Sequence, residues 1–424
     1  MKLTQEQQTI LDGKKGETQA KVMETLVRYG ELFGADEMVP ITSKYNHLVT
    51  SFGLKALGAV YSLLDQLIDA GAVSKQEFSA DPRPLDKNVP ANLLEKFVFN
   101  NFMYTKQEEY EKQLEKLGLM NKNAFTCTAY MPEVGNVPNK GDILSWSESS
   151  AVVYANSVLG ARCNRNSGII DIMGSIAGFV PSFGLLKDEG RKATWVVRIE
   201  TSKKPEAQLL GSAIGMKVVE DVPYIIGLDK YLDGKLDDDA KAYLKDFGAA
   251  TASNGAVGLY HVENITPEAV EQGRSLIADG AREYVIDDAE LKRVYDSYPI
   301  IWKNKDAKPK LCFIGCPHLS MAQLKGWSRD IKMALKANGR RKVAVPTVLT
   351  TAPDVLEAFR NEKEYQDLVN VGVILSYICP LMYMNNPICQ KVPTITSSNK
   401  LRTYTSARYY KDAELLEIIT GGRN

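Results

Sequence analysis

The segment LCFIGCPHLS, residues 311–320, indicates how the C-terminal part of the chain folds. Its apolar run Leu311 to Ile314 is typical of a buried strand. The Gly315-Cys316-Pro317 corner that follows cannot continue that strand regularly, and Ser320 begins a helical pattern. We therefore predict a strand that ends at Ile314, with a cysteine just beyond its carboxyl end.

The same arrangement recurs downstream of this segment. Strand patterns occupy KVAVPTVLT (342–350) and VGVILSYI (371–378), and a helical pattern near 354–369 lies between them. The alternation predicts a β–α–β–α–β unit with a parallel sheet. Open parallel sheets bind ligands beyond the carboxyl ends of their strands. Because Cys379 also follows a strand and precedes a proline, we expect Cys316 and Cys379 to lie at that edge.

The rest of the chain also mixes helical and strand patterns, which predicts an α/β fold with parallel or mixed sheets flanked by helices. Helices are expected over 4–33 with a glycine-rich interruption, and over 56–72, 91–120, 147–159, 205–218 and from Pro267. Ser147 is the expected N-cap of the helix over 147–159. Strands are expected over 195–200 and 222–228, and a glycine-rich loop over 249–265. A length of 424 residues favours two or three domains. We divide the chain into an N-terminal α/β part (1–120), a central polar part (121–305) and a C-terminal β–α–β part (306–424).

The overall composition excludes several classes of protein. Lys plus Arg and Asp plus Glu number 52 each, so net charge gives no reason to expect nucleic acid or an anionic membrane as a partner. The polar N-terminus does not match a signal peptide, and no apolar run is long enough to span a bilayer. We therefore expect a cytoplasmic protein. Its six cysteines are too sparse for a disulfide scaffold, so they are buried thiols, metal ligands or nucleophiles.

Three cysteines on three separate loops indicate one soft metal centre. Cys127, in TCTAY, precedes a long polar segment, and it joins Cys316 and Cys379 as a candidate ligand. Cys312 and Cys389 fit better as small buried apolar residues. The absence of a CxxC pair disfavours a zinc ribbon, whereas a nucleophilic Cys316 near His318 remains an alternative. Three widely spaced cysteines suit an iron–sulfur cubane whose open iron is a Lewis acid for the loss of water.

These residues also carry a family resemblance that runs nearly end to end. The chain resembles the large, catalytic subunit of aconitase X, a branch of the aconitase superfamily. The resemblance rests on LDGKKGE (11–17), the polar segment 126–168 with ESSAVVYANSVLGAR, the segment 248–269, FIGCPHLS (313–320), CPLMY (379–383) and TSSNK (396–400). It implies an aconitase-like multi-domain α/β fold around a central cluster cleft and hydro-lyase activity. It also implies a separate small swivelling-domain subunit.

The resemblance further implies a cofactor and a set of site residues. The cofactor is an iron–sulfur cluster of the 4Fe–4S type, or a 3Fe–4S or 2Fe–2S form, held by Cys127, Cys316 and Cys379. Substrate contacts are implied for Asn136, Glu148, Ser149, Ser150, Arg162, Arg165 and Arg83, and catalytic roles for Ser398 and Lys400. Arginine is suited to bidentate recognition of a carboxylate. The general base is expected on the small subunit, with Ser398 as the alternative within this chain.

Two loops depart from the family pattern, which leaves the substrate open. Tyr45 stands where the family usually has histidine, and Asp81-Pro82-Arg83-Pro84 replaces an Asn-Pro-x-Gly turn. The expected substrate is a small hydroxy-carboxylate like cis-3-hydroxy-L-proline, and the alternative is (R)-5-phosphomevalonate. Two other classes remain: a cysteine-nucleophile enzyme without iron, and a non-catalytic binding subunit that has lost the cluster.

Overall fold

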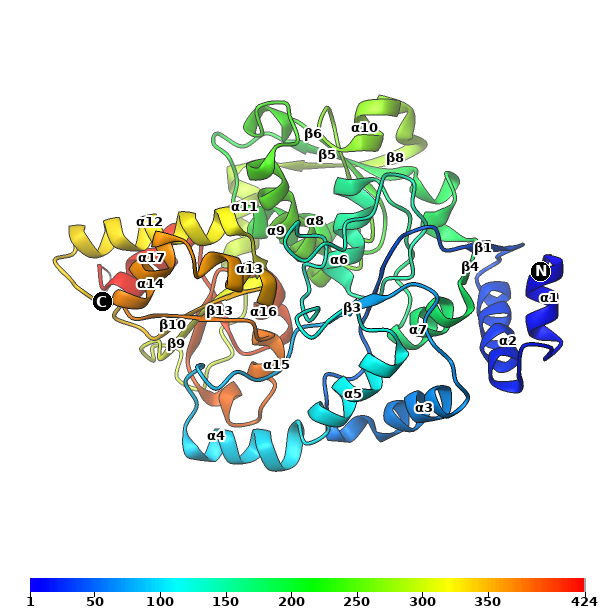
Figure 1. Ribbon diagram of the computed structural model, residues 1–424. Helices are drawn as coiled ribbons and strands as arrows, with labels where there is room; N and C mark the ends of the chain where they lie inside the picture. Colours follow the sequence, from blue (N-terminus) through cyan, green and yellow to red (C-terminus); the bar gives the residue numbers. More distant parts are fainter. Residues whose placement is uncertain (423–424) are drawn as a thin grey trace.

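The computed structural model describes residues 1–422, and its C-terminal part is built on a five-stranded sheet. All its strands are parallel, in the order β11-β10-β9-β12-β13. Figure 1 labels three of them, β9, β10 and β13. The strands are β9 (Leu311–Leu319), β10 (Thr347–Thr351), β11 (Val373–Ser376), β12 (Thr394–Thr396) and β13 (Arg408–Tyr409). The helices are α12 (Met321–Ala337), α13 (Pro353–Phe359), α14 (Lys363–Asn370), α15 (Pro380–Met384), α16 (Asn399–Tyr404) and α17 (Asp412–Thr420). This confirms the predicted parallel β–α–β–α–β unit.

Strand β9 is longer than predicted because it contains a bulge. Cys312 to Ile314 pair in register with Thr347 to Leu349, but the next partners are Leu319 and Thr351. Gly315 adopts φ +109°, and a Cβ there would lie 2.4 Å from the carbonyl oxygen of Thr350. Only glycine fits this close approach with a positive φ. The predicted strand end at Ile314 is therefore wrong as a boundary, although regular pairing does stop there.

A four-stranded parallel sheet, in the order β7-β6-β5-β8, forms the upper part of Figure 1. Its strands are β5 (Ala193–Ile199), β6 (Pro223–Ile226), β7 (His261–Val262) and β8 (Ile277–Ile286). The helices of this region are α8 (Ala207–Val218), α9 (Asp238–Asn254), α10 (Pro267–Gln272) and α11 (Asp288–Asp296).

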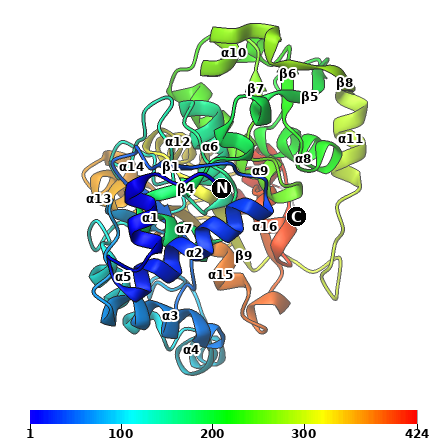
Figure 2. The same cartoon turned by 90° about the vertical axis from the view of Figure 1, so that its right-hand side faces the viewer.

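Helix α9 corrects one prediction, because residues 249–254 of the expected loop are helical. Helices α8 and α9 lie side by side below the sheet (Figures 1 and 2). A Cβ added at Gly211 of α8 would lie 2.3 Å from the carbonyl oxygen of Phe247. The small residues that indicated a loop therefore serve close helix–helix packing.

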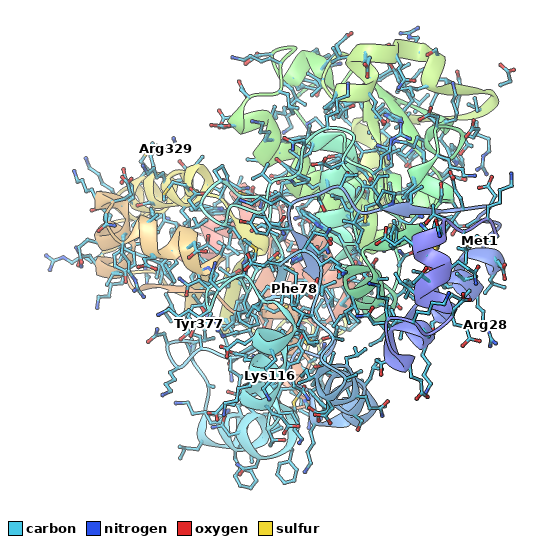
Figure 3. All side chains as sticks on the ribbon, turned by 45° about the vertical axis from the view of Figure 1, so that its right-hand side comes forward. Met1, Arg28, Phe78, Lys116, Arg329 and Tyr377 are labelled. Atoms are coloured by element: carbon cyan, nitrogen blue, oxygen red, sulfur yellow. The ribbon has the colours of Figure 1, made fainter. Side chains whose placement is uncertain are left out.

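The N-terminal part combines helices with two small sheets. Strands β1 (Met38–Pro40) and β4 (Phe179–Pro181) pair antiparallel, and β2 (Asn46–Leu48) and β3 (Phe78–Ala80) pair parallel. Its helices are α1 (Gln5–Leu11), α2 (Glu17–Leu32), α3 (Gly58–Asp69), α4 (Leu93–Val98), α5 (Gln107–Leu117) and α7 (Gly168–Ala177). In Figure 3, Phe78 of β3 lies in the interior, whereas Arg28, Lys116 and Arg329 lie on the outside. Within residues 1–422, no helix has the length and apolar character needed to cross a membrane.

Helix α6 (Ser149–Tyr154) occupies the middle of the molecule and continues as a π-helical turn over Ala155–Leu159 (Figure 1). Its N-cap is Glu148, whose carboxylate accepts a hydrogen bond from the Ala151 amide. The predicted cap, Ser147, instead accepts a hydrogen bond from the amide of Val49 at 2.7 Å. Ser147 thus fixes the loop after β2 against the start of α6.

Candidate active site

A cavity of about 310 Å³ lies where the N-terminal part, helix α6 and the C-terminal sheet meet. The bulge of β9, the start of α15 and the loop that follows β3 contribute to its wall. All three predicted ligands, Cys127, Cys316 and Cys379, line this cavity. The rule that ligands gather beyond strand ends therefore located the cavity correctly.

The three thiols are close enough to influence one another. Burial raises the pKa of each of them, and the neighbouring Cys316 further raises the pKa of both Cys127 and Cys379. The Cys127 sulfur also accepts a hydrogen bond from the backbone amide of His318 at 3.4 Å. Hydrogen bonds of this kind accompany metal-bound thiolates. Without a metal these groups are neutral thiols, which are poor nucleophiles.

Hydrogen bonds on both sides of the bulge hold Cys316 in place. The Thr350 hydroxyl donates to the carbonyl oxygen of Gly315 at 2.6 Å. The carbonyl oxygen of Cys316 accepts hydrogen bonds from the Ser398 hydroxyl and, at 3.4 Å, from the Gln208 amide. These contacts tie the bulge to β10, α8 and the start of α16, so the Cys316 side chain has a defined direction.

His318 is not a base for Cys316. Its Nε2 donates to the carbonyl oxygen of Ile378 at 3.0 Å, which leaves Nδ1 to accept a hydrogen bond from the Thr126 hydroxyl at 3.0 Å. Burial lowers the pKa of His318 to about 4. The ring is therefore neutral, and both of its nitrogens have partners other than the thiol. This geometry argues against a cysteine–histidine dyad.

A buried ion pair joins Glu148, the N-cap of α6, to Lys400 of helix α16. The Lys400 ammonium donates to Glu148 Oε1, and to the Ser150 hydroxyl at 3.2 Å. Glu148 Oε2 accepts hydrogen bonds from the Ser150 hydroxyl and the Ala151 amide, both at 2.6 Å. Burial opposes ionisation of Glu148, but the Lys400 charge and these hydrogen bonds outweigh it and lower its pKa to about 2. Lys400 and Glu148 both line the cavity as ions, together with Ser149.

Arg165 lines the cavity without a partner of its own. Within residues 1–422 its guanidinium forms no hydrogen bond or ion pair, and its Nη1 is sealed from solvent. Burial lowers the pKa of Arg165, and the interactions with Tyr404 and Glu148 only partly offset this. A Cβ at Gly258 would lie 3.2 Å from Cδ of Arg165, so Gly258 makes room for the arginine stem. This partly buried guanidinium has the chemistry to bind an anionic group.

Asn156 explains why the turn after α6 places Arg165 in the cavity. Its side chain accepts a hydrogen bond from the amide of Cys163 at 2.9 Å and donates to the carbonyl oxygens of Cys163 and Gly258, each at 2.8 Å. The turn is thereby fixed on both sides. The polar residues of the segment 126–168 thus have structural as well as cavity-facing roles.

The structure places five predicted site residues outside the lining of this cavity. One is Ser150, whose hydroxyl contacts Glu148 and Lys400. Arg162 donates to the carbonyl oxygen of Leu186 at 2.8 Å and pairs with Asp188. Arg83 forms a two-bond pair with Glu111, each bond 2.9 Å long, and lies over the Phe125 ring. Their contacts are those of structural arginines.

Asn136 and Ser398 are the other two residues outside the cavity. Asn136 donates to the carbonyl oxygen of Asn46 at 2.8 Å and to the Ser79 hydroxyl at 2.9 Å. Ser398 caps α16 by accepting from the Leu401 amide at 3.1 Å, and it lines a smaller cavity of about 60 Å³ behind Cys316. The Ser398 hydroxyl is thus committed to the backbone, which does not suit a general base.

Several residues of the cavity wall were not named as site residues from the sequence. They are Phe52, Met382, Tyr404 and Asp81, although the loop that contains Asp81 was noted for its departure from the family pattern. For Asp81 a signal was present, because it directly follows β3 at the carboxyl end of a parallel pair. The rule applied to the cysteines would have found it, but strand β3 has only three residues and was not predicted.

Comparisons with known proteins agree with this picture. The family model of the aconitase X first domain matches residues 1–189, and that of the second domain matches residues 193–296. The phosphomevalonate dehydratase large subunit of Thermococcus kodakarensis is 33% identical over 376 residues, which cover 87% of this chain and 86% of that protein. The cis-3-hydroxy-L-proline dehydratase of Pseudomonas aeruginosa is 27% identical over 359 residues, covering 82% of this chain and 56% of that protein.

A solved structure shows the same fold. The crystal structure of Thermococcus kodakaraensis aconitase X in its holo-form superposes with a TM-score of 0.79 and 29% sequence identity, covering 98% of this chain and 99% of that one. The α/β fold, the family models and the relatives, which are dehydratases, therefore lead to one assignment. This chain belongs to the aconitase X family as a large subunit, and it is a hydro-lyase.

Proposed function

We propose that this chain is the large subunit of an iron–sulfur dehydratase that acts on (R)-5-phosphomevalonate. The observation that carries the proposal is a single cavity that combines three thiols with a partly buried arginine, which has no hydrogen-bond or ion-pair partner within residues 1–422. The relatives support this substrate over cis-3-hydroxy-L-proline, which the sequence analysis ranked first. The chain spans 86% of the phosphomevalonate dehydratase subunit but only 56% of the hydroxyproline enzyme.

The donor set fits a cluster better than a single ion. Within the described part of the chain, no three Cys, His, Asp or Glu side chains are grouped so as to hold one metal ion. In a 4Fe–4S cluster each cysteine binds a different iron, so the sulfurs stand farther apart than ligands of one ion. Cys127, Cys316 and Cys379 would hold the cluster. When bound, it would supply a Lewis-acidic iron that polarises the C–O bond to be broken.

The chain's own residues would bind and orient the substrate. Arg165 offers its unpaired guanidinium to one anionic group of the substrate, and such forks bind carboxylate and phosphate oxygens well. The Lys400 ammonium, held by Glu148 and Ser150, offers a second positive charge at the same wall. Phe52, Leu381 and Met382 contribute apolar surface, which excludes water and strengthens these electrostatic contacts.

A small subunit would complete the site. The matching relative from T. kodakarensis is a large subunit, which implies a smaller partner. Ser398, the candidate base within this chain, is bound to the backbone outside the cavity. We therefore place the base that removes the C–H proton on the small subunit.

The test is turnover by the anaerobically reconstituted two-subunit enzyme. (R)-5-phosphomevalonate and cis-3-hydroxy-L-proline are each supplied, and the alkene product is followed by proton NMR. We expect dehydration of phosphomevalonate, and little or none from the large subunit alone. Dehydration of hydroxyproline but not phosphomevalonate would refute the substrate assignment. Full activity without iron would refute the proposal that the enzyme needs an iron–sulfur cluster.

A further inference from the structure

We propose that Asp81 is a specificity-determining residue that hydrogen-bonds the hydroxyl group of the substrate. The inference rests on the proposed function and concerns the same cavity. It follows from the position of the carboxyl group, from the groups that hold it and from the complementary chemistry of Arg165.

Asp81 directs one carboxyl oxygen to the protein interior and leaves the other for a ligand. The residue lines the cavity, and its side chain is 11% exposed. Oδ1 is sealed from solvent and has no hydrogen-bond partner within residues 1–422. Oδ1 lies 3.8 Å from Nε2 of His47, which is likewise sealed and unpartnered. Oδ2 also makes no hydrogen bond within this part of the chain but is not sealed, so it is the oxygen that a ligand can reach.

A rigid network stands behind the carboxyl group. The Ser79 hydroxyl accepts a hydrogen bond from the Asn136 amide at 2.9 Å and lies 2.9 Å from Nδ1 of His47. Its own proton reaches Nδ1 better than the carbonyl oxygen of Asn46 at 3.5 Å. His47 is then protonated on Nε2, which lies 3.8 Å from Oδ1 of Asp81. The Trp146 ring packs edge-on against His47 with centroids 5.6 Å apart, so the imidazole keeps this orientation.

The charge state of Asp81 suits a hydroxyl group. Burial raises its pKa well above the ordinary value, the Glu148 charge raises it further, and Lys400 only partly opposes this. A carboxyl group that retains a proton can donate and accept hydrogen bonds, as a hydroxyl group can. Arg165, by contrast, can only donate and is suited to an anion. Asp81 and Arg165 together match a molecule that carries both a hydroxyl and an acidic group.

The experiment measures recognition of the hydroxyl group without the cluster, since a bound iron would also interact with that group. Full-length chain free of iron is titrated by anaerobic calorimetry with (R)-5-phosphomevalonate and with the analogue that lacks the tertiary hydroxyl. The pair cis-3-hydroxy-L-proline and L-proline is measured in the same way. The chain is expected to bind one of these two pairs. Within that pair, the wild-type chain should bind the hydroxy compound with about tenfold or more higher affinity than the analogue, because the analogue leaves a buried polar group unpaired.

Three variants decide the outcome. Asp81→Ala should reduce the preference to about threefold or less, whereas Asp81→Asn, which keeps a donor and an acceptor, should retain most of it. Asp86→Ala is the matched control, because Asp86 lies in the same loop and accepts from the Ser376 hydroxyl at 2.8 Å. An unchanged preference in Asp81→Ala, or no preference in the wild type, would overturn the inference. The proposed function is judged separately by turnover of the loaded two-subunit enzyme.

Discussion

The two large parallel sheets have the same kind of topology, but their carboxyl edges are chemically different. Beyond β5 and β6, the polar groups satisfy one another. Tyr231 donates to the carbonyl oxygen of Thr201 at 2.5 Å, Lys230 donates to that of Ile199 at 3.4 Å, and the Ser202 amide donates to Asp288 at 3.2 Å. Beyond β9, the cavity is lined by free thiols and by the unpartnered Arg165.

This contrast shows what strand topology can and cannot indicate. A parallel sheet provides an edge at which ligands are able to bind. A buried polar group without a partner is costly, so it persists where a ligand compensates for it. In this protein the unpaired groups distinguish the edge that forms the candidate site from the edge that is only structural.

The largest effect is expected when a cysteine that lines the cavity is replaced. Cys316→Ser should abolish cluster assembly and turnover, because it removes a ligand from the cavity. Iron and sulfide analysis after anaerobic reconstitution, together with the visible absorption spectrum, measures the result. Cys312→Ser is the matched control, since Cys312 lies in the same strand but is packed in the core. Equal loss of iron in both variants would show that the ligand choice is wrong.

The second prediction compares a buried ion pair with an exposed one. Lys400→Met should lower the free energy of unfolding by about 3–5 kcal/mol, because it leaves the Glu148 charge buried and unpaired. The double variant Lys400→Met/Glu148→Gln should recover much of this loss. Arg198→Met, which breaks the surface pair with Glu283 in the other sheet, should cost at most about 1 kcal/mol. Urea denaturation measures all three, and similar losses for both single variants would contradict the comparison.

The third prediction concerns acid pH. The pKa of Glu148 is lowered from 4.5 to about 2, so its ionisation stabilises the fold fully above pH 4.5, and this contribution is lost as the pH falls towards 2. The difference in unfolding free energy between wild type and Glu148→Gln should therefore be constant near neutrality and shrink by a few kcal/mol in that window. Denaturation at several pH values measures it. A difference that is independent of pH would mean that Glu148 is not an ionised partner of Lys400.

The smallest expected effect is a difference in substrate affinity between variants of Arg165 and of Arg162. Arg165→Lys should weaken binding of (R)-5-phosphomevalonate by roughly tenfold, because an ammonium cannot reproduce the guanidinium fork. Arg162→Lys should change the affinity by less than about threefold, because Arg162 pairs with Asp188 outside the cavity. Calorimetric titration of the full-length chain measures both. A larger effect at Arg162 would reverse the assignment.

Much of the fold could be predicted from the sequence, and the exceptions have physical reasons. Apolar runs and periodicity identified strands β9, β10 and β11 of the C-terminal sheet and the helices between them, but not β12 and β13. The segment 249–254 was misjudged because small residues promote both loops and close helix packing. The short strands β2 and β3 were hard to recognise since each has only three residues and is stabilised mainly by its neighbours.

The three cysteines of the candidate site could be predicted from the sequence, but the hydrogen-bond and ion-pair partners of its other side chains could not. Cysteines after strands, together with the family resemblance, identified the three thiols that share the cavity. Residue type alone could not separate Arg165 from Arg162, because that difference depends on the Asn156 bonds and on the partner Asp188. Asp81 was not named as a site residue because the three-residue strand β3 before it was not predicted, and its lack of a hydrogen-bond partner for Oδ1 is visible only in the structure.

The contact between Lys400 and Glu148 has a consequence for the timing of biosynthesis. It joins residues 252 positions apart, and the cavity also draws its thiols from positions 127, 316 and 379. Cys127 and Glu148 therefore emerge from the ribosome long before their partners exist. The pocket closes only after residue 400 has been translated and released from the exit tunnel. Assembly of the proposed cluster on these thiols is thus expected only after residue 379, the last of the three cysteines, has been translated.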